Sequence, residues 1–540
     1  MPLTPERLAA GTSLRVTGGE RAAALAATWH AALTDVAACV RPLPGSPAGA
    51  DGGAPTEPLT EPLTAALTEG GPYPGCWLES TGSISTEVLG RFAPGVARDT
   101  HLLLARGARD DGLLPYKVTD DGPAHAQIQR VTPLARSVWE QYLRSGRDDR
   151  GRADGGRDDE GRDTDYLREM YAALAADDAW VAEHRDTRGT GGVEAFCTYD
   201  TGHDASPRFW HVPDTCPDGD PARFDAAHPL LPFVAPDLTA EAYARRVHLA
   251  RAAEELGEDP RPWRAAASDS LAALDRLWHA GDETWYDRDA TGEPVRIRTD
   301  VLLRVLACGV GDDALFDRLL RRHLLSTRGF LAPAGFTSVA LDDPRFDRDA
   351  TRNSWGGPVN FLALLRAPRA FEAHGRTAEL ARALRGAFDA LLRADRFPQT
   401  LDPWTGDAGY GSGYSPAALF FLDAVERFFG VLELPDGGVL CTGLSAADPG
   451  RWPGVESLTY ERPTRSGVWA QTVAGDRVAV TRDGSPWLAF PVGWRVELAP
   501  SGEVAAVTGV SGRPVAGTLT LPDGTRTDLT LAPNERVAPR

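Results

Sequence analysis

The feature that most constrains this chain is a repeated alternation of paired helical segments and long loops before residue 430. Apolar residues recur at helical spacing, a short turn follows, a second helical segment returns, and a long loop comes next. Pro260 and Gly375 mark two of the turns, and Gly430 ends the last helical segment. The predicted helices are 20–40, 83–107, 127–143, 241–256, 261–279, 300–308, 313–325, 358–374, 376–393 and 416–429. Helical hairpins of this kind gather their long loops at one end, where binding residues usually collect.

The pattern changes after residue 430, where short runs of Val, Leu and Thr are separated by turn dipeptides. The stretch GTLTLPDGTRTDLTL alternates on both sides of Pro522-Asp523-Gly524, which is typical of a β-hairpin. We therefore predict a helical domain over 1–434 and a small, sandwich-like, all-β domain over 435–540. We expect the β-domain to cover an apolar face of the helical domain rather than to bind sugar by itself.

Two segments of the predicted helical domain have few groups that could be buried. Residues 42–71 are rich in Pro, Ala, Thr and Gly, and residues 144–165 alternate both charges with almost no apolar side chain. Neither segment can bury enough surface to offset the entropy of ordering it, so both are predicted to be mobile insertions.

Charge and cysteine content exclude several classes of partner. With 76 acidic and 57 basic residues the net charge is -19, which argues against nucleic-acid binding. The six cysteines are scattered without a C-x-x-C pair or a His cluster at metal spacing, so we expect no metal and no cofactor. The first residues lack an apolar signal segment, and no apolar run is long enough to span a bilayer. We expect a cytoplasmic protein with reduced, buried thiols and no membrane partner.

The loop Tyr199 to Asp214, YDTGHDASPRFWHVPD, carries the best candidate for catalysis, Asp204. Aromatic side chains in a polar loop suit a sugar ring, which stacks through its C–H face. Partial burial among them would raise the pKa of Asp204 toward that of a general acid. An aspartate ahead of Ser206-Pro207 can instead hydrogen-bond its own backbone in a turn, and the local residues alone favour the turn.

The order of motifs resembles one family. Residues 202–208, GHDASPR, resemble the G-W-D-x-S-P-R loop of the six-hairpin (α/α)6-barrel glycosidases, the group of mannosylglycerate hydrolase, processing α-glucosidase I and trehalase, with His203 in place of Trp. Further similar segments follow the family order at 72–79 (PYPGCWLE), 111–116 (DGLLPY), 277–287, 334–346 and 354–360 (SWGGPVN). The resemblance spans roughly 70–430. It implies an (α/α)6 barrel in which Asp204 is the general acid of an inverting hydrolysis.

One motif departs from the family. Residues 397–406, FPQTLDPWTG, resemble F-x-E-x-Y-x-P-x-T-G, in which the Glu is the general base. Here Gln399 occupies that position, and an amide cannot accept a proton from water at any useful pH. An inverting mechanism needs a carboxylate opposite the acid, so another residue would have to act. The alternatives are Asp402, Asp407 and Glu79, of which we favour Glu79.

These observations predict a glycoside hydrolase that acts on a small-molecule carbohydrate, either an oligosaccharide or a glycoconjugate. The predicted catalytic residues are Asp204, Glu79 and Asp402. The predicted substrate-binding residues are Trp77, Tyr199, His203, Arg208, Trp210, Arg352, Asn353, Trp355, Gln399 and Tyr410. Arg352 and Asn353 could bind a carboxylate or hydroxyls, or form a salt bridge within their loop. Two further functions stay open: a sugar epimerase, isomerase or uronate lyase that uses His203, His211 and Tyr410, and a carbohydrate-binding protein without activity.

Overall fold

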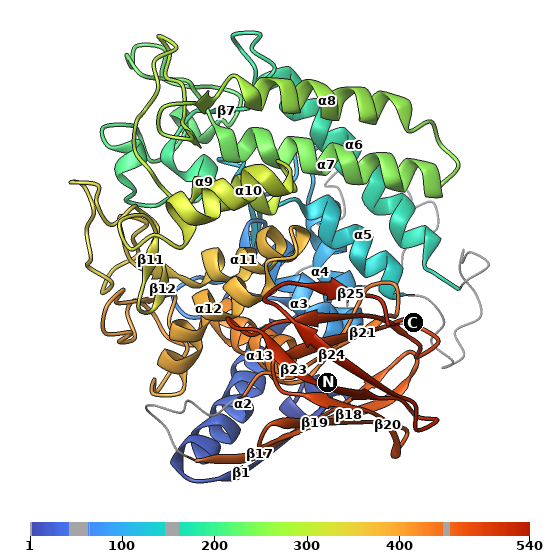
Figure 1. The fold of residues 1–540 in the computed structure, drawn as a ribbon. Helices are drawn as coiled ribbons and strands as arrows, with labels where there is room; N and C mark the ends of the chain where they lie inside the picture. The colour runs from blue at the N-terminus through green and yellow to red at the C-terminus, as the bar shows by residue number, and fades with distance from the viewer. Residues whose placement is uncertain (1–2, 43–62, 64, 146–160, 446–453, 540) are drawn as a thin grey trace.

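A computed structural model describes residues 3–42, 63, 65–145, 161–445 and 454–539, and Figure 1 shows most of its helices above a set of strands. The α-helices are α1 (Pro5–Ala9), α2 (Glu20–Cys39), α3 (Ser85–Phe92), α4 (Pro94–Arg106), α5 (Leu134–Arg144), α6 (Thr164–His184), α7 (Pro236–Glu255), α8 (Arg261–Asp275), α9 (Val301–Ala307), α10 (Asp313–Leu319), α11 (Phe361–Ala373), α12 (Thr377–Leu391) and α13 (Ser415–Phe429). Among the described residues, none of these helices combines the length and the apolar character needed to cross a bilayer.

Most predicted helices are present, and the differences have local causes. The predicted helix 83–107 is interrupted at Ala93, because Pro94 has no N–H to continue the ladder and instead starts α4. The predicted helix 127–143 begins only at Leu134, directly after Pro133. Helix α6 was not predicted. Its N-cap, Asp163, accepts a hydrogen bond from the Tyr166 backbone N–H and lies at the end of the charged segment assigned to an insertion.

Short strand pairs tie the long loops together. Strand β13 (Val359–Asn360) pairs with β14 (Thr400–Leu401), and β7 (Glu194–Ala195) pairs with β8 (Phe233–Val234). Strand β4 (Cys76–Trp77) pairs with β5 (Lys117–Thr119), which continues to β6 (Gly122–Ala124). The remaining pairs are β2 (Val40–Arg41) with β3 (Ala66–Leu67), β9 (Trp278–His279) with β10 (Thr284–Trp285), and β11 (Leu331–Ala332) with β12 (Gly335–Phe336). Loops far apart in sequence are therefore held side by side.

The C-terminal part consists of two antiparallel sheets. One has the order β1-β17-β18-β19-β20-β23-β24 and the other the order β15-β16-β21-β22-β25. Their strands are β1 (Ser13–Gly18), β15 (Val431–Glu433), β16 (Val439–Thr442), β17 (Val455–Thr464), β18 (Gly467–Ala474), β19 (Arg477–Arg482), β20 (Ser485–Pro491), β21 (Trp494–Leu498), β22 (Val504–Gly509), β23 (Val515–Thr520), β24 (Arg526–Leu531) and β25 (Arg536–Val537). The hairpin predicted around Asp523-Gly524 is present as β23 and β24.

The division of the chain is less simple than the predicted boundary between 434 and 435. Strand β1, near the N-terminus, pairs with β17 along an edge of the larger sheet, and Figure 1 shows the two strands side by side. Strand β15 begins at Val431, before the predicted boundary. Apolar side chains of both sheets share one buried cluster with α2 and α13. Trp29 of α2 meets Tyr460 of β17 edge to face, with ring centroids 5.6 Å apart. The β-part thus covers an apolar face of the helices.

The two predicted mobile insertions lie mostly outside the described residues, which omit 43–62, 64 and 146–160. The described ends of both segments are ordered, so the prediction is wrong for them. Residues 66–67 form β3, and the side chains of Thr68 and Glu69 are buried. Thr164 begins α6.

Candidate active site

Asp204 lies in a loop whose backbone is fixed by turns. The short 3-10 helix Thr198–Thr201 precedes it and the 3-10 helix Pro207–Phe209 follows. Gly202 has φ +63°, and a Cβ at this position would come within 1.9 Å of Glu79 Oε2. Glycine is therefore required at 202 for two reasons, its backbone conformation and the close approach of Glu79.

The carboxyl of Asp204 is mostly buried and is held by a second loop. Asn353 Nδ2 donates to Asp204 Oδ2 at 2.5 Å, and the Trp355 backbone N–H donates to the Asp204 carbonyl at 2.8 Å. The pKa of Asp204 is raised to about 7: burial is the largest cause, the Asn353 amide opposes it, and the negative charge of Glu79 adds to it. A carboxyl with this pKa can hold a proton near neutral pH and release it, as a general acid must.

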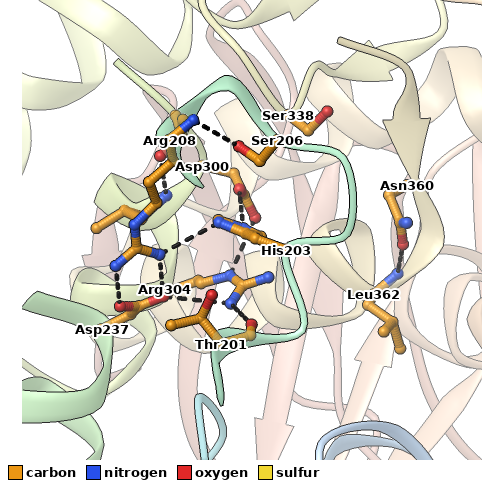
Figure 2. A network of polar contacts seen from close by, with 12 residues as sticks. Thr201, His203, Ser206, Arg208, Asp237, Asp300, Arg304, Ser338, Asn360 and Leu362 are labelled. Atoms are coloured by element: carbon orange, nitrogen blue, oxygen red, sulfur yellow. Dashed lines mark hydrogen bonds and ion pairs between the residues drawn. The ribbon is translucent and has the colours of Figure 1, made fainter. Parts of the chain in front are cut away.

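Two predicted substrate-binding residues, His203 and Arg208, belong instead to a buried polar network beneath the loop, which Figure 2 shows. Arg208 is bound by Asp237 and Asp287, with four N···O distances of 2.6–2.7 Å. His203 Nε2 lies 2.9 Å from Asp300 Oδ1, and Arg208 Nη1 lies 3.2 Å from His203 Nδ1. Because burial lowers the pKa of His203 to about 4, the ring is neutral. The prediction that these two side chains contact sugar is wrong, since both are fully enclosed.

Trp355 is a third residue whose predicted role changes. Its side chain is only 2% exposed and packs on His203, with ring centroids 5.0 Å apart. The Arg304 guanidinium lies 4.8 Å from the Trp355 ring centroid. Trp355 therefore offers no open face for a sugar to stack on. Its contact with Asp204 is the hydrogen bond from its backbone N–H to the Asp204 carbonyl.

Several predicted residues do gather around one aromatic side chain, Tyr73. Its ring lies 6.0 Å from Trp77 and 6.4 Å from Tyr410, measured between centroids. Its hydroxyl donates to Gln399 Oε1 at 2.8 Å. Burial raises the pKa of Tyr73, and the negative charges of Glu69 and Asp204 raise it as well. The Tyr73 phenol therefore interacts electrostatically with the candidate acid. Sequence reasoning missed Tyr73, although it stands in the PYPGCWLE segment.

Glu69 is a second residue that the sequence analysis missed. It is buried, and Tyr414 donates its hydroxyl to Glu69 Oε1 at 2.8 Å. Burial raises the pKa of Glu69 to about 8, with contributions from the charges of Glu79 and Asp204. The residue lies in the segment assigned to a mobile insertion, which is why it was not considered.

The two predicted bases have different surroundings. Glu79 is buried; its Oε1 accepts from Arg366 at 2.7 Å and from Arg304 at 3.5 Å, and its Oε2 accepts from Gln129 at 3.2 Å. Asp402 forms a turn, in which its Oδ1 accepts from the backbone N–H groups of the two residues Trp404 and Thr405.

Asp402 Oδ2 also accepts from Arg348 at 2.8 Å. The backbone hydrogen bonds and Arg348 together lower the pKa of Asp402, as is typical of a turn residue.

The other predicted residues, Tyr199, Trp210 and Arg352, are more exposed than Glu79. Tyr199 is half-buried, and the charge of Asp204 contributes to raising its pKa. Trp210 is 49% exposed. Arg352 is exposed and forms ion pairs with Asp347 and Asp349, so the loop salt bridge that the sequence left open is present.

Within the described residues, one group has the geometry to hold a metal ion: Cys197, Asp200 and Cys216. The Asp200 carboxylate is already engaged, because Arg185 binds it through Nη1 at 2.5 Å and Nη2 at 3.1 Å. The Phe196 and Ile128 backbone N–H groups also donate to it, at 2.7 and 3.0 Å. Two thiols alone do not make the three- or four-ligand site that a protein-bound zinc ion requires.

Comparison with known proteins gives a family and a fold. The family model described as the mannosylglycerate hydrolase MGH1-like glycoside hydrolase domain matches residues 73–415. A mannosylglycerate hydrolase from Thermus thermophilus, solved in complex with Tris and D-glycerate, is similar at a TM-score of 0.55 with 20% identity, over 66% of this chain and 95% of that chain. Comparison with curated protein sequences found no match.

Two more solved structures share the fold at 11% identity. The neutral trehalase from Saccharomyces cerevisiae is similar at a TM-score of 0.51, over 67% of this chain and 74% of that chain. A sialidase is similar at a TM-score of 0.60, over 90% of this chain and 41% of that chain. These likenesses concern the fold. Because the family match covers well over half of the chain, the protein belongs to the mannosylglycerate hydrolase MGH1-like glycoside hydrolases and is a glycosidase.

Proposed function

We propose that the helices close into an (α/α)6 barrel and that the loops at one end hydrolyse a glycosidic bond of an oligosaccharide or glycoconjugate. Asp204 is the general acid of this reaction. The family match and the fold shared with mannosylglycerate hydrolase and trehalase support the reaction class. The observation that carries the assignment of Asp204 is its mostly buried carboxyl, bound by Asn353 and with a pKa of about 7.

In the proposed reaction the protonated Asp204 transfers its proton to the glycosidic oxygen as the C–O bond breaks. Asn353 occupies Oδ2, so we assign the transferred proton to Oδ1. The ionised carboxylate that remains is stabilised by the same Asn353 amide, which lowers the pKa of Asp204. Proton donation to a leaving group in this way contributes about 10²–10⁴-fold to a rate.

A water molecule then attacks the anomeric carbon from the opposite face, and a carboxylate must take its proton. We assign this role to Glu79, because its charge acts on Asp204 and its loop carries Trp77 beside Tyr73. Arg366 and Arg304 both bind Oε1, whereas Oε2 accepts one longer hydrogen bond from Gln129, so we assign the proton to Oε2. Gln399, held by Tyr73, would orient the water or a sugar hydroxyl. Attack from the opposite face inverts the anomeric configuration.

The epimerase or lyase alternative has less support. It named His203, His211 and Tyr410 as groups that could remove a proton from carbon. The His203 ring is enclosed between Asp300, Arg208 and Trp355. A buried neutral imidazole whose two nitrogen atoms both face protein groups cannot approach a substrate.

The proposal is tested with mannosyl and glucosyl glycosides, including those of glycerate, in both anomeric forms. Proton NMR of the anomeric signal identifies the first product. We expect hydrolysis of one anomer, with the opposite configuration in the sugar released first. A first product with retained configuration would contradict inversion, and sugar binding without any turnover would contradict hydrolysis.

A further inference from the structure

Two cysteines meet at the base of the loop that carries Asp204. Cys216 Sγ lies 3.6 Å from Cys197 Sγ, and the two side chains are 2% and 0% exposed. The backbones beside them are joined, because Thr198 N–H donates to the Pro213 carbonyl at 2.9 Å and Tyr199 N–H donates to the Asp214 carbonyl at 3.2 Å. A disulfide has an S–S distance of about 2.05 Å, so the two sulfur atoms need to approach by less than 2 Å to bond.

The contact is not explained by metal binding or by the proposed reaction. Asp200, the third member of the group, is committed to Arg185 and to backbone N–H groups, as described above. The glycosidase mechanism uses neither thiol. The other cysteines of the chain, Cys39, Cys76, Cys308 and Cys441, are also free and buried, and they belong to other apolar clusters.

We propose that Cys197 and Cys216 are an oxidative modification site, at which a hydroperoxide converts the two thiols into a disulfide that closes the Asp204 loop. One thiolate attacks the peroxide oxygen, which forms a sulfenic acid and releases hydroxide. The second sulfur attacks the sulfenic sulfur and expels a second hydroxide. With the two thiol protons, the net change is two thiols and one hydrogen peroxide to one disulfide and two waters.

Burial makes this site slow to form and slow to reverse. The hydrogen bond from Cys216 and burial both raise the pKa of Cys197, which keeps the reactive thiolate scarce. Hydrogen peroxide is close to water in size and can enter when the loop opens locally, whereas a bulky thiol reductant is excluded once the loop is closed. The disulfide therefore acts as a lock on the loop that positions Asp204 rather than as a fast switch.

The locked loop should keep Asp204 in place at higher temperature. A cross-link between residues 197 and 216 restricts the unfolded chain over the segment that holds Asp204, and such restriction raises stability when native geometry is undisturbed. Because the backbones on both sides are already paired, the oxidised loop needs only a small movement of the sulfur atoms.

The test is peroxide treatment of the folded enzyme, followed by blocking of free thiols, digestion and mass spectrometry. We expect a loss of 2 Da, two of the six thiols protected, one cross-linked peptide pair containing Cys197 and Cys216, and a higher Tm. The Cys308→Ala variant is the matched control, since it lacks a different buried thiol and should form the same cross-link. The Cys216→Ala variant should form none and should show no rise in Tm on treatment.

The proposal would be overturned if the folded wild-type enzyme kept all six thiols after prolonged treatment with peroxide in large excess over the concentration that oxidises a control thiol peptide. It would also be overturned if the cross-link joined other cysteines, or if Cys216→Ala gained the same Tm as the wild type. These readouts are masses and melting temperatures, so they stand whether or not Asp204 is the general acid.

Discussion

The side-chain amide of Asn353 donates a hydrogen bond of 2.5 Å to the carboxyl of Asp204, across 149 positions of sequence. Two residues after Asn353, the Trp355 backbone N–H binds the Asp204 carbonyl. One loop therefore fixes both the backbone and the side chain of the candidate acid. The same amide favours the ionised form of Asp204, so it tunes the pKa as well as the position of this group.

Removing this amide should move the pH dependence of the reaction. In Asn353→Ala the ionised form of Asp204 loses a donor, so the pKa of Asp204 should rise above its value of about 7. The alkaline limb of kcat/KM should shift upward by about one pH unit, and kcat should fall about tenfold because the acid is less well oriented. Asn534→Ala, which removes an amide that binds Glu379 and caps α12 rather than Asp204, is the control. An alkaline limb unchanged in Asn353→Ala would show that the amide does not act on the acid.

Asp204 should also make the fold less stable at alkaline pH. Its folded-state pKa of about 7 lies above the unfolded value of about 3.9, so the folded chain holds a proton over this window that the unfolded chain has released. Raising pH from 4 to 7 therefore costs stability, and the cost is complete above pH 7. The Asp204→Asn variant lacks this cost. Its free energy of unfolding should exceed that of the wild type by about 1–3 kcal/mol at pH 8 and should be about equal to it at pH 4. Urea unfolding at the two pH values measures the difference. Equal stability at pH 8 would contradict the raised pKa.

Glu79 should matter to both folding and catalysis. In Glu79→Gln the buried guanidinium groups of Arg366 and Arg304 lose the negative charge that they share, which should cost about 3–5 kcal/mol in the free energy of unfolding. If Glu79 is the base, added azide should attack the sugar in place of the activated water and restore turnover, giving a glycosyl azide of inverted configuration.

The matched control for that variant is Asp402→Asn, which alters a turn residue of the neighbouring loop. It should cost about 1 kcal/mol and should show no azide product. Azide rescue in Asp402→Asn, or in Glu69→Gln, together with none in Glu79→Gln, would transfer the role of base to that residue.

The aromatic residues should divide into those that hold substrate and those that do not. Trp77 packs at a centroid distance of 5.8 Å from Tyr116 and 6.0 Å from Tyr73, which makes a fixed wall beside Gln399. Trp77→Ala should raise KM about tenfold, equivalent to about 1.4 kcal/mol of binding free energy. Trp210, with half its surface exposed, should tolerate the change to alanine with less than about a twofold effect on KM. Initial rates over a range of substrate concentrations separate the two variants, and an equal rise in KM would contradict this division.

Much of the fold was predictable because helical periodicity and turn residues are local signals. Helix α2 was expected to end at 40 and ends at Cys39, and the hairpin at Asp523-Gly524 appears where its alternation placed it. The pairing of β1 with β17 was not predictable in the same way. It joins residues more than 400 positions apart, and a six-residue strand gives no sign of its partner.

The site shows the same limit. The motif singled out Asp204, but it gave no sign that Asn353, which we expected to bind substrate, would donate a hydrogen bond to the Asp204 carboxyl. The motif also gave no sign that the side chains of His203 and Arg208 are buried. The carboxylates that bind them belong to distant segments of the chain, at Asp237, Asp287 and Asp300. Glu69 was missed because the composition of its segment is typical of a mobile insertion. Its hydrogen-bond partner, Tyr414, is 345 positions away in the sequence.

The central claim, that Asp204 donates a proton to the leaving oxygen, is tested most directly by comparing two leaving groups in Asp204→Asn. The glycosyl fluoride and the alkyl glycoside should both carry the sugar that the wild-type enzyme hydrolyses fastest. Fluoride departs with little help from an acid, whereas an alkoxide needs the proton. We predict that the variant loses about 10³-fold or more in kcat/KM on the alkyl glycoside and about tenfold or less on the fluoride. Equal losses on the two substrates, or no loss on the alkyl glycoside, would contradict the account.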